Sequence, residues 1–549
     1  MKKKKIFLVF LLIMIASVYV MSGCTGNNKK TDNNPVEEVW NGISHEGENI
    51  IDDKYGTTYQ ILLYTFCDSD GDGIGDINGL ISKLDYIKDL GFDSIWLLPF
   101  NQSNTYHKYD VVDYYSVDKE YGTMEDFENL VKECDSRNID IYMDFVINHT
   151  SAKNQWFIDA CNYLKELPAG SEPDAKECPY VDYYNFKQAT STPSNYHKVA
   201  GTTDWYYECV FWDQMPDLNL DSDAVKKEIE NIASFWIDKG IKGFRLDAAL
   251  HYFEGNPDKS TEALKWFCDY VYSINPDIYC VAEVWDTYTT MAKFYESHID
   301  SIFDYAYGNN DGILCKYVNK YGDGESGSKL SNSTVKLYNI YKEAYGNFVE
   351  GIFADNHDTG RIAGFLGRDE NRIKIASGIE ILSTGHVFIY YGDELGMSGS
   401  GKDENKRAPM YWTSDESAQG MTKGPSGYEK QEHSFGSLED QKDEQYSIYN
   451  YYKKAIHIRN TYPSIGRGEP VVMDDVTSQN GNLYAISKTY EDESVCIIFN
   501  NSDEEITFTV SKDKYGYEDI ADYLTVKEGR PSIDGEEITL PAFAGIVLK

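Results

Sequence analysis

Carboxylates, one arginine and several histidines stand where short apolar runs of this sequence end. In chain order they are Asp144, Asn148, His149, Arg245, Asp247, His251, Glu283, His357 and Asp358. Two carboxylates are the minimum set for hydrolysis of a glycosidic bond, because one attacks the anomeric carbon and the other protonates the leaving oxygen. A retaining mechanism needs the two carboxyl groups roughly 5–5.5 Å apart. The pattern therefore predicts glycoside chemistry, provided that the fold brings these positions together.

Eight apolar, strand-like runs supply the elements that must position these side chains. They are residues 60–66, 94–98, 139–145, 243–246, 278–281, 301–303, 351–354 and 387–391. Helical patterns such as 80–90 and 124–137 lie between most of them. Apolar runs without strict alternation are typical of a parallel sheet that is buried on both faces. Eight such units predict an α/β fold of the (β/α)8 TIM-barrel type, in which chemistry collects at the carboxyl ends of the strands.

Two stretches depart from this alternation and predict further domains. Residues 150–221 are rich in Tyr, Trp, Asn and Pro and indicate a small inserted domain after strand 3. The barrel would then comprise residues 51–149 and 222–465. Residues 466–549 contain short alternating strands without helical periodicity, which predicts a C-terminal antiparallel β-sandwich domain.

Six motifs resemble those of the α-amylase family, family 13 of the glycoside hydrolases. MDFVINH (143–149), GFRLDAALH (243–251), VAEVW (281–285) and FADNHD (353–358) match its four conserved regions in order and spacing. QMPDLNLD (214–221) is similar to its fifth region, and YGDELGM (391–397) to the segment after its eighth strand. The wording at 215–219 resembles a group intermediate between oligo-1,6-glucosidases and neopullulanases, which acts largely on α-1,4 linkages. The resemblance covers residues 59–549.

The resemblance implies a catalytic role for three acids. Asp247 would be the nucleophile and Glu283 the general acid and then the base, while Asp358 would bind sugar hydroxyls and help to distort the ring. Since Arg245 precedes Asp247 by two residues, both side chains point the same way from the strand end. Asp144 would support Arg245 and the barrel. The residues implied to bind substrate are His107, Tyr109, His149, Arg245 and His357.

Two residues depart from the family pattern. Lys108 stands where the family usually has Gly in Tyr-His-Gly-Tyr, which puts the backbone of this loop in question. Leu250 stands where many α-amylases carry a Lys that reaches toward the sugar on the leaving side. The leaving-side subsites are therefore not predicted by the resemblance.

An acidic loop after the first strand predicts a calcium site. Its candidate ligands are Asp68, Asp70, Asp72, the carbonyl of Ile74, and Asp76. Acids at positions 1, 3, 5 and 9 with Gly at 6 copy an EF-hand loop, although Gly79 replaces the bidentate Glu of position 12. The alternative is an acidic loop without metal. The resemblance supports Ca2+ as the cofactor.

A second calcium site is implied by the resemblance alone. It would use Asn148, the carbonyl of His251 and an acid of the inserted domain. Asp182 and Asp204 are candidates for that acid.

The charge and composition of the chain exclude several classes of partner. Lys and Arg number 51 and Asp and Glu 90, so the net charge is −39. A nucleic-acid surface needs concentrated Lys and Arg, so we expect no nucleic-acid partner. The hydrophobic share of 41% and aromatic share of 14% exclude a disordered acidic chain. We expect a globular monomer.

The N-terminus resembles a bacterial lipoprotein signal. Lys2 to Lys5 precede an apolar run over 6–20, and small residues stand directly before Cys24. We expect residues 1–23 to be removed, Cys24 to be acylated, and residues 24–50 to form a flexible tether. The alternative is an uncleaved anchor helix, and in both cases the protein is held at the outer face of the bacterial cell membrane.

The nine remaining cysteines give no zinc-site spacing. Several lie in apolar strand-like runs and are expected to be buried thiols. Cys161 and Cys178 lie in a loop-rich stretch, where a disulfide between them is the open alternative.

These observations predict an exported, lipid-anchored α-glucan hydrolase that cleaves α-1,4 bonds of starch and maltodextrins with retention. Two alternatives use the same site, namely a 4-α-glucanotransferase and an oligo-α-glucosidase. A third is a non-catalytic maltodextrin-binding lipoprotein. The intact set of Asp247, Glu283 and Asp358 argues against this third alternative, because a binding protein needs neither an acid nor a nucleophile.

Overall fold

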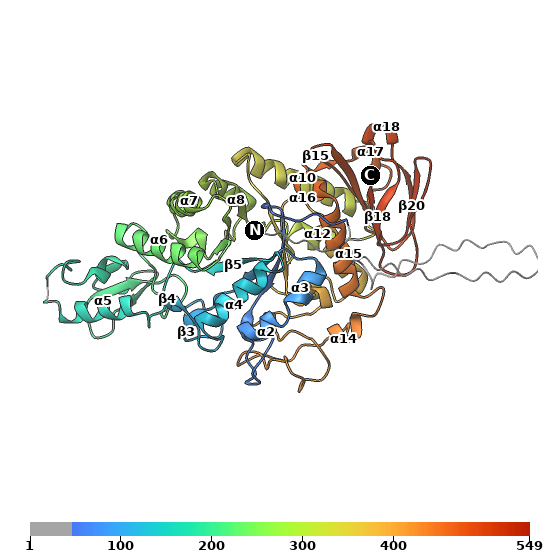
Figure 1. Cartoon of the computed structure of the whole chain (residues 1–549). Helices are drawn as coiled ribbons and strands as arrows, with labels where there is room; N and C mark the ends of the chain where they lie inside the picture. Colours follow the sequence, from blue (N-terminus) through green and yellow to red (C-terminus); the bar gives the residue numbers. More distant parts are fainter. Residues whose placement is uncertain (1–44, 46, 169) are drawn as a thin grey trace, which may run out of the picture. The chain divides into compact units, whose positions relative to one another are not determined.

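The computed structural model describes residues 45, 47–168 and 170–549, and its centre is a closed parallel sheet (Figure 1). The strand order is β11-β10-β9-β5-β2-β1-β13-β12, and a parallel bridge between Phe303 and Gly351 joins the two ends of this order. The strands are β1 (Thr57–Ile61), β2 (Ser94–Leu97), β5 (Asp140–Phe145), β9 (Gly243–Leu246), β10 (Tyr279–Ala282), β11 (Ser301–Ile302), β12 (Gly351–Phe353) and β13 (His386–Tyr390). The predicted (β/α)8 barrel is confirmed.

A helix follows each barrel strand and lies outside the sheet. These helices are α3 (Leu84–Leu90), α4 (Met124–Asp135), α6 (Asp223–Asp238), α7 (Pro257–Ile274), α8 (Tyr288–Phe294), α10 (Ser326–Ala344), α12 (Glu370–Ile381) and α15 (Ile448–Thr461). Helix α4 illustrates the local cause: Thr123 and Asp126 form a capping box, and Phe127, Leu130 and Cys134 bury one face. Shorter helices of the connections include α1 (Leu63–Phe66), α2 (Ile77–Ile81), α9 (Ile313–Val318), α11 (Ile362–Phe365), α13 (Asp403–Lys406), α14 (Leu438–Gln441), α16 (Pro463–Arg467), α17 (Asp474–Thr477) and α18 (Lys512–Tyr515).

Two predicted elements near the start of the barrel have different bounds in the structure. The first strand was expected over 60–66, but β1 ends at Ile61 and residues 63–66 form helix α1. A short apolar run fits a buried strand and a buried helical turn equally well, so the pattern does not separate them. The helix expected over 80–90 is divided into α2 and α3, and Asp76 caps the first of them through the backbone N–H of Gly79.

The segment between β5 and β9 carries a small sheet of its own. Helix α5 (Gln155–Glu166) is followed by β6 (Phe186–Gln188), β7 (Tyr196–Lys198) and β8 (Trp205–Glu208), paired antiparallel in the order β6-β8-β7. An antiparallel bridge from His149 to Asp217 ties the end of this segment to the end of the third barrel strand. The insertion therefore borders the edge of the barrel from which the site residues arise.

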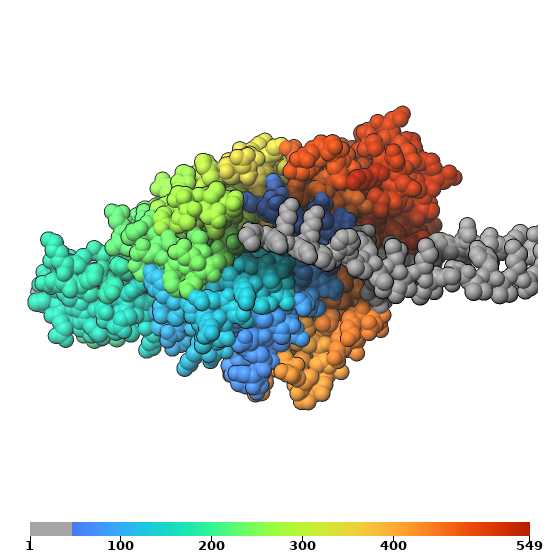
Figure 2. Space-filling model, viewed as in Figure 1, coloured from blue at the N-terminus to red at the C-terminus, as the bar shows by residue number. Residues whose placement is uncertain are grey.

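The C-terminal region contains two antiparallel sheets that share a core. The first has the order β14-β15-β16-β21-β18 and the second β17-β20-β19. Their strands are β14 (Val471–Val472), β15 (Leu483–Tyr490), β16 (Glu493–Asn500), β17 (Ile506–Thr509), β18 (Ile520–Leu524), β19 (Ser532–Asp534), β20 (Glu537–Leu540) and β21 (Gly545–Leu548). Leu483 and Ile498 of the first sheet and Phe508 and Ile538 of the second lie in one buried cluster. Figure 2 shows the inserted segment and these sheets on opposite sides of the barrel.

The described cysteines are all free thiols, including Cys161 and Cys178, so the structure contains no disulfide between this pair. The predicted signal (1–23), the acylated Cys24 and most of the predicted tether lie outside the described residues. Among the helices that the structure describes, none combines the length and the apolar character needed to cross a bilayer.

Candidate active site

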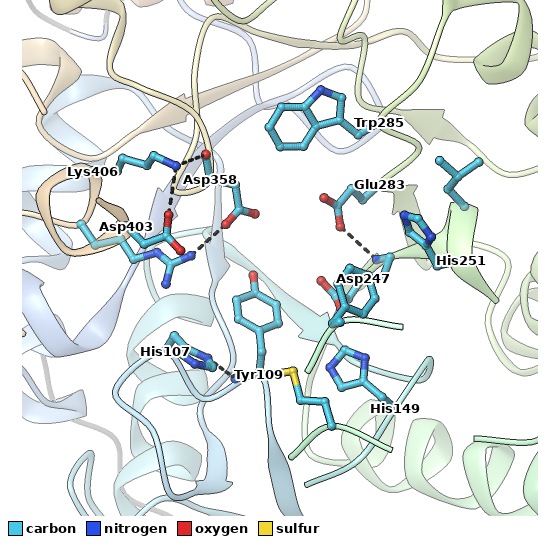
Figure 3. Close-up of a pocket in the computed structure, with 15 residues that line it drawn as sticks. His107, Tyr109, His149, Asp247, His251, Glu283, Trp285, Asp358, Asp403 and Lys406 are labelled. Atoms are coloured by element: carbon cyan, nitrogen blue, oxygen red, sulfur yellow. Dashed lines mark hydrogen bonds and ion pairs between the residues drawn. The ribbon is translucent and has the colours of Figure 1, made fainter. Parts of the chain in front are cut away.

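A cavity of about 550 Å3 opens where the barrel strands end (Figure 3). Its lining comprises His107, Tyr109, His149, Phe211, Met215, Asp247, Ala248, Leu250, His251, Glu283, Trp285, Asp358, Asp403, Lys406 and Arg407. Asp247 directly follows β9, Glu283 directly follows β10, and Asp358 lies in the loop after β12. The parallel topology thus brings together three acids that are far apart in sequence.

Arg245 on β9 is the centre of the acidic cluster. Its Nη1 donates to Asp144 Oδ1 at 2.9 Å and to Asp247 Oδ1 at 2.5 Å, and its Nη2 donates to Glu283 Oε2 at 2.8 Å. Arg245 and Asp144 are fully buried. One guanidinium therefore fixes the predicted nucleophile and the predicted acid relative to each other.

The backbone after Asp247 adds a second constraint on Glu283. Ala248 adopts a positive φ of 50°, which is uncommon for a residue with a side chain and turns the chain directly after β9. The Ala248 N–H donates to Glu283 Oε2 at 2.9 Å. The turn that follows Asp247 thus also orients the acid at the end of the next strand.

The electrostatics of the cluster favour a protonated Glu283. Burial raises its pKa, the charges of Asp247 and Asp358 raise it further, and Arg245 opposes both. Burial also raises the pKa of Asp247, against the charge and hydrogen bond of Arg245. The same guanidinium also faces Asp144, and burial raises the pKa of this third carboxyl to about 8 against the charge of Arg245. A raised pKa is what a general acid needs near neutral pH.

Asp358 lies across the cavity from Glu283 in a different environment (Figure 3). His357 Nε2 contacts its Oδ2 at 3.0 Å, and Arg407 Nη2 donates to its Oδ1 at 2.8 Å. Burial opposes ionisation, but His357 and the guanidinium of Arg407 outweigh it and hold the pKa of Asp358 well below its usual range. The environment of Asp358 therefore favours the ionised carboxylate, whereas the environment of Glu283 favours the protonated acid.

Tyr109 lines the cavity, and the fully buried His357 lies against it. Their rings stack at 5.6 Å with an angle of 7°, and Tyr109 Oη lies 2.6 Å from His357 Nε2. Tyr109 Oη donates to Asp144 Oδ2 at 2.8 Å. The Gln60 amide donates to His357 Nδ1 at 2.8 Å, which leaves Nε2 as the ring donor toward Asp358. A sugar ring in the cavity would meet Tyr109, whereas His357, which was predicted to bind substrate, does not line the cavity.

Lys108 resolves the question raised by the missing glycine. It adopts a φ of 63°, the left-handed conformation that Gly provides most easily. Its ammonium group is buried and lies 3.1 Å from Asp118 Oδ2, with a second ion pair to Glu120. The loop keeps a glycine-like backbone because buried ion pairs hold the lysine in place.

His107 and His149 are neutral polar groups of the lining. Burial lowers the pKa of each to about 4, and the charge of Arg407 adds to this effect at His107. The Asn148 amide nitrogen lies 3.3 Å from His149 Nδ1, so Nε2 carries the proton. His149 Nε2 is buried and has no hydrogen-bond partner among the described residues, which suits a donor that waits for a substrate hydroxyl.

Several lining residues were not found by sequence reasoning. Arg407 comes from the loop after β13, 49 positions beyond its partner Asp358. Asp403 and Lys406 lie in the same loop, and Lys406 Nζ donates to the carbonyl of Asp358 at 2.7 Å. No local motif marks these residues. Trp285 stands inside VAEVW, beside the predicted acid, so its position was an available signal.

The acidic loop after β1 gathers three of the four predicted calcium acids. Asp68, Asp70 and Asp76 each offer an oxygen within 4.8 Å of the others. Ligands on opposite sides of Ca2+ at 2.3–2.6 Å are at most about 5 Å apart, so this spacing fits the ion. Asp72 is not part of this group; its Oδ1 accepts the N–H of Ile74 at 2.7 Å.

The acid that the structure places beside Asn148 is Asp217, which was not among the candidates for the second predicted calcium site. Asp217 Oδ1 lies 3.5 Å from the Asn148 amide nitrogen. Asp217 and His251 line a cavity of about 240 Å3 whose lining includes neither Asp182 nor Asp204. Burial raises the pKa of Asp217 to about 8, and neighbouring acids add to the shift, so a cation here would restore its charge.

Comparison with known proteins links this geometry to one family. A model of the alpha amylase catalytic domain matches residues 60–468. Alpha-amylase 3 of Dictyoglomus thermophilum is 35% identical over 469 residues, which cover 84% of this chain and 87% of that protein. Oligo-1,6-glucosidase of Bacillus cereus is 28% identical, with 90% and 99% covered. The solved structure of Eubacterium rectale Amy13B has a TM-score of 0.87 and 42% identity, covering 91% of this chain and 96% of that one.

Proposed function

Because the chain belongs to the α-amylase family of glycoside hydrolases, we propose that it hydrolyses α-1,4-glucosidic bonds of starch and maltodextrins with retention. The observation that carries this proposal is the shared guanidinium of Arg245, which binds Asp247 and Glu283 while Asp358 faces them across the cavity. A pair of carboxylates, one as nucleophile and one as acid, is the set that a double displacement requires.

In the first step, a carboxylate oxygen of Asp247 forms a bond to the anomeric carbon. The bond from that carbon to the leaving oxygen breaks, and Glu283 gives its proton to this oxygen. Arg245 holds Asp247 Oδ1, which leaves Oδ2 for the attack. Asp358 and the His149 ring nitrogen bind hydroxyls of the same sugar, and their hydrogen bonds strengthen as charge develops in the transition state.

In the second step, water attacks the anomeric carbon of the glycosyl-enzyme. Glu283 now takes a proton from this water, and the ester bond to Asp247 breaks. The enzyme returns to its starting protonation state, and two inversions give net retention.

A second hollow next to the catalytic cavity favours a substrate with several donor glucose units over one with a single donor unit. This donor-side hollow has a volume of about 670 Å3 and is lined by Thr105, Tyr106, His107, Trp212, Gly401, Lys402, Asp403, Glu404 and Arg407. It shares His107, Asp403 and Arg407 with the catalytic cavity, on the side opposite Glu283. A donor can therefore extend past the cleaved unit. An oligo-α-glucosidase needs only one donor unit, so the hollow supports the proposed α-amylase activity over the oligo-α-glucosidase alternative.

The test is digestion of starch, maltotriose, pullulan, isomaltose and cyclodextrin, with products followed by size and by anomer. We expect α-1,4 cleavage with α-anomers formed first, and loss of nearly all turnover in Glu283→Gln with binding retained. Initial β-anomers would refute the double displacement. Turnover of isomaltose alone would favour the oligo-α-glucosidase. Transfer products without hydrolysis would favour the 4-α-glucanotransferase, and the absence of any turnover would favour the maltodextrin-binding lipoprotein.

We also propose that the protein is exported and anchored at the outer face of the membrane through acylated Cys24. The support is the sequence of the first residues, a basic start, an apolar run and small residues before the cysteine. Labelled palmitate should enter the protein in cells and should fail to enter Cys24→Ala. Release of wild-type protein into the medium without label would contradict the anchor.

Calcium is proposed as the structural cofactor of the acidic loop, held by Asp68, Asp70 and Asp76. A bound cation would offset the repulsion among these carboxylates and fix the connection after β1. Asn148, Asp217 and the His251 carbonyl are proposed for the second ion. Neither ion takes part in the steps above.

A further inference from the structure

A fully buried arginine joins the loop that carries Asp358 to the loop that carries Arg407. Arg361 lies three residues after Asp358, and its exposed fraction is 0%. It is not part of the lining of the catalytic cavity, and it takes no part in the steps above. A buried cation is costly unless it is paired and hydrogen-bonded, so the partners of Arg361 indicate what it holds in place.

Arg361 contacts three backbone carbonyls of the segment that follows β13. Its Nη1 donates to the carbonyl of Tyr391 at 2.8 Å, and its Nε donates to the carbonyl of Lys406 at 3.2 Å. Its backbone N–H donates to the carbonyl of Gly399 at 2.9 Å. These contacts span residues 391–406, so one residue of the Asp358 loop fixes both ends of this segment.

Two buried acids and an aromatic ring hold the guanidinium of Arg361. Its Nη1 also donates to Asp393 Oδ1 at 3.1 Å, and Asp393 shares a hydrogen bond with Asp355. The guanidinium lies over the ring of Tyr390, 4.2 Å from the centroid. Burial raises the pKa of both acids, to about 6 for Asp355. These acids can therefore take up a proton if the cation is removed.

The carbonyl of Lys406 connects Arg361 to the catalytic cavity. Arg407 follows Lys406 directly, and its Nη2 donates to Asp358 Oδ1 at 2.8 Å. Its Nε donates to the carbonyl of His357 at 3.2 Å. The chain from Asp358 to Arg361, the bond from Arg361 to Lys406 and the bond from Arg407 to Asp358 form a closed ring. The distance between Arg407 and Asp358 therefore depends on Arg361.

We propose that Arg361 is a positioning residue, which sets the place of Arg407 and thereby orients the Asp358 carboxylate toward the sugar. This inference rests on the proposed function, because it uses the binding of the sugar by Asp358. Arg361 touches neither the substrate nor the reacting atoms, so it acts through Arg407. Without Arg361, the Lys406 carbonyl loses a donor and Arg407 can shift. A shift of about 1 Å at a positioned group costs on the order of 100-fold in rate.

The test is a double-mutant cycle between Arg361 and Arg407, measured as kcat/KM per mole of folded enzyme. The substrate is an aryl α-maltoside, because its good leaving group keeps slow variants measurable. Arg361→Met keeps the aliphatic stem, removes the side-chain hydrogen bonds and should lower kcat/KM by about 100-fold. Added to Arg407→Met, the same change should cost no more than about twofold. Equal losses in both backgrounds would contradict a route through Arg407.

Arg459 provides a matched control for the loss of a buried arginine. It is buried and donates to the carbonyls of Ile381 at 3.0 Å and Ser383 at 2.6 Å, but it is not part of the cavity lining. Arg459→Met should therefore lower the melting temperature without lowering kcat/KM of the folded enzyme. A loss of kcat/KM as large as that of Arg361→Met would show a general effect of buried arginines and would overturn the inference.

Tyr390→Phe tests the same contact if Arg361→Met fails to fold. Tyr390 Oη donates to the Lys406 carbonyl at 3.3 Å. Its removal should lower kcat/KM by about fivefold, as expected for one neutral hydrogen bond, and this effect should disappear in the Arg407→Met background. An unchanged kcat/KM in Arg361→Met, or in Tyr390→Phe where Arg361→Met does not fold, would overturn the inference while the hydrolase stands. A wild type that cleaves neither maltodextrin nor the aryl α-maltoside would instead refute the proposed function.

Discussion

The buried ion pairs of Lys108 yield the sharpest structural prediction. Lys108→Met keeps most of the aliphatic stem and the need for a positive φ, but it removes the ammonium group. Asp118 would then lose its cation while 3% exposed, and Glu120 would lose one while 39% exposed. The variant thus isolates the charge from the backbone conformation.

The magnitude follows from these two partners. Breaking a buried ion pair by removing one member costs about 3–5 kcal/mol, because the remaining charge is left uncompensated. Asp118 keeps hydrogen bonds from the N–H groups of Ser103 and Glu120, both at 2.9 Å, so we expect the lower end of this range. The exposed partner Glu120 adds less than about 1 kcal/mol. Lys108→Met should therefore reduce the free energy of unfolding by about 3 kcal/mol.

Activity should fall together with stability, because this loop carries His107 and Tyr109 into the cavity. A shift of about 1 Å at a positioned group costs on the order of 100-fold in rate. The assay is denaturant unfolding together with kcat/KM on maltodextrin. Lys108→Gly is the matched variant, since it relieves the positive φ and also removes the ion pairs. If Lys108→Met proves as stable and active as the wild type, the ion pairs do not hold the loop and this reasoning fails.

Three further predictions concern charge, metal and substrate length. Glu283 acts while protonated, so activity is present below its pKa and is lost as the pH rises through that pKa. Asp358→Asn removes a charge that raises this pKa, so the alkaline limb of the residual kcat/KM on an aryl α-maltoside should move to lower pH. A shift of this limb to higher pH would contradict the assignment of Glu283. Calcium at 100 times its Kd should stabilise the fold by about 2.7 kcal/mol per site, so a chelator should lower the melting temperature of the wild type by more than that of Asp68→Asn, which keeps only the second proposed site; equal shifts would count against the loop site. Trp212→Ala should reduce kcat/KM on maltopentaose by about tenfold, as expected for one aromatic contact, and leave that on an aryl α-glucoside nearly unchanged; equal losses on both would argue against the donor-side hollow.

The predicted bounds of the barrel strands agree with the structure for some apolar runs and differ for others. The run 243–246 is found as β9 with the same bounds, and both of its neighbours, β5 and β10, pair with it in parallel. The run 60–66 was ambiguous between strand and helical turn, and the structure divides it at Leu62. In the C-terminal region, residues 538–548 divide into β20 and β21 of different sheets, since Pro541 has no amide hydrogen and Phe543 has a φ of 53°.

The candidate site was predictable where residues follow strands and not where they come from long loops. Asp247 and Glu283 meet because β9 and β10 are neighbours in parallel register. Arg407, Phe211 and Trp212 reach the cavity from the loop after β13 and from the insertion, whose paths no local pattern determines. Asp217 lies within the QMPDLNLD motif, but its position beside Asn148 comes from the bridge between His149 and Asp217, which the motif alone does not predict.

The central claim is that Asp247 forms a covalent bond to the substrate. An α-glucosyl fluoride with a second fluorine on the sugar ring slows hydrolysis of the glycosyl-enzyme more than its formation, so the intermediate accumulates. Mass spectrometry of the digested protein should find one added fluoroglucosyl group on the peptide that contains Asp247, and none in Asp247→Asn. An adduct on another residue, or fluoride release by wild-type enzyme without an adduct and with a β-configured product, would contradict the account.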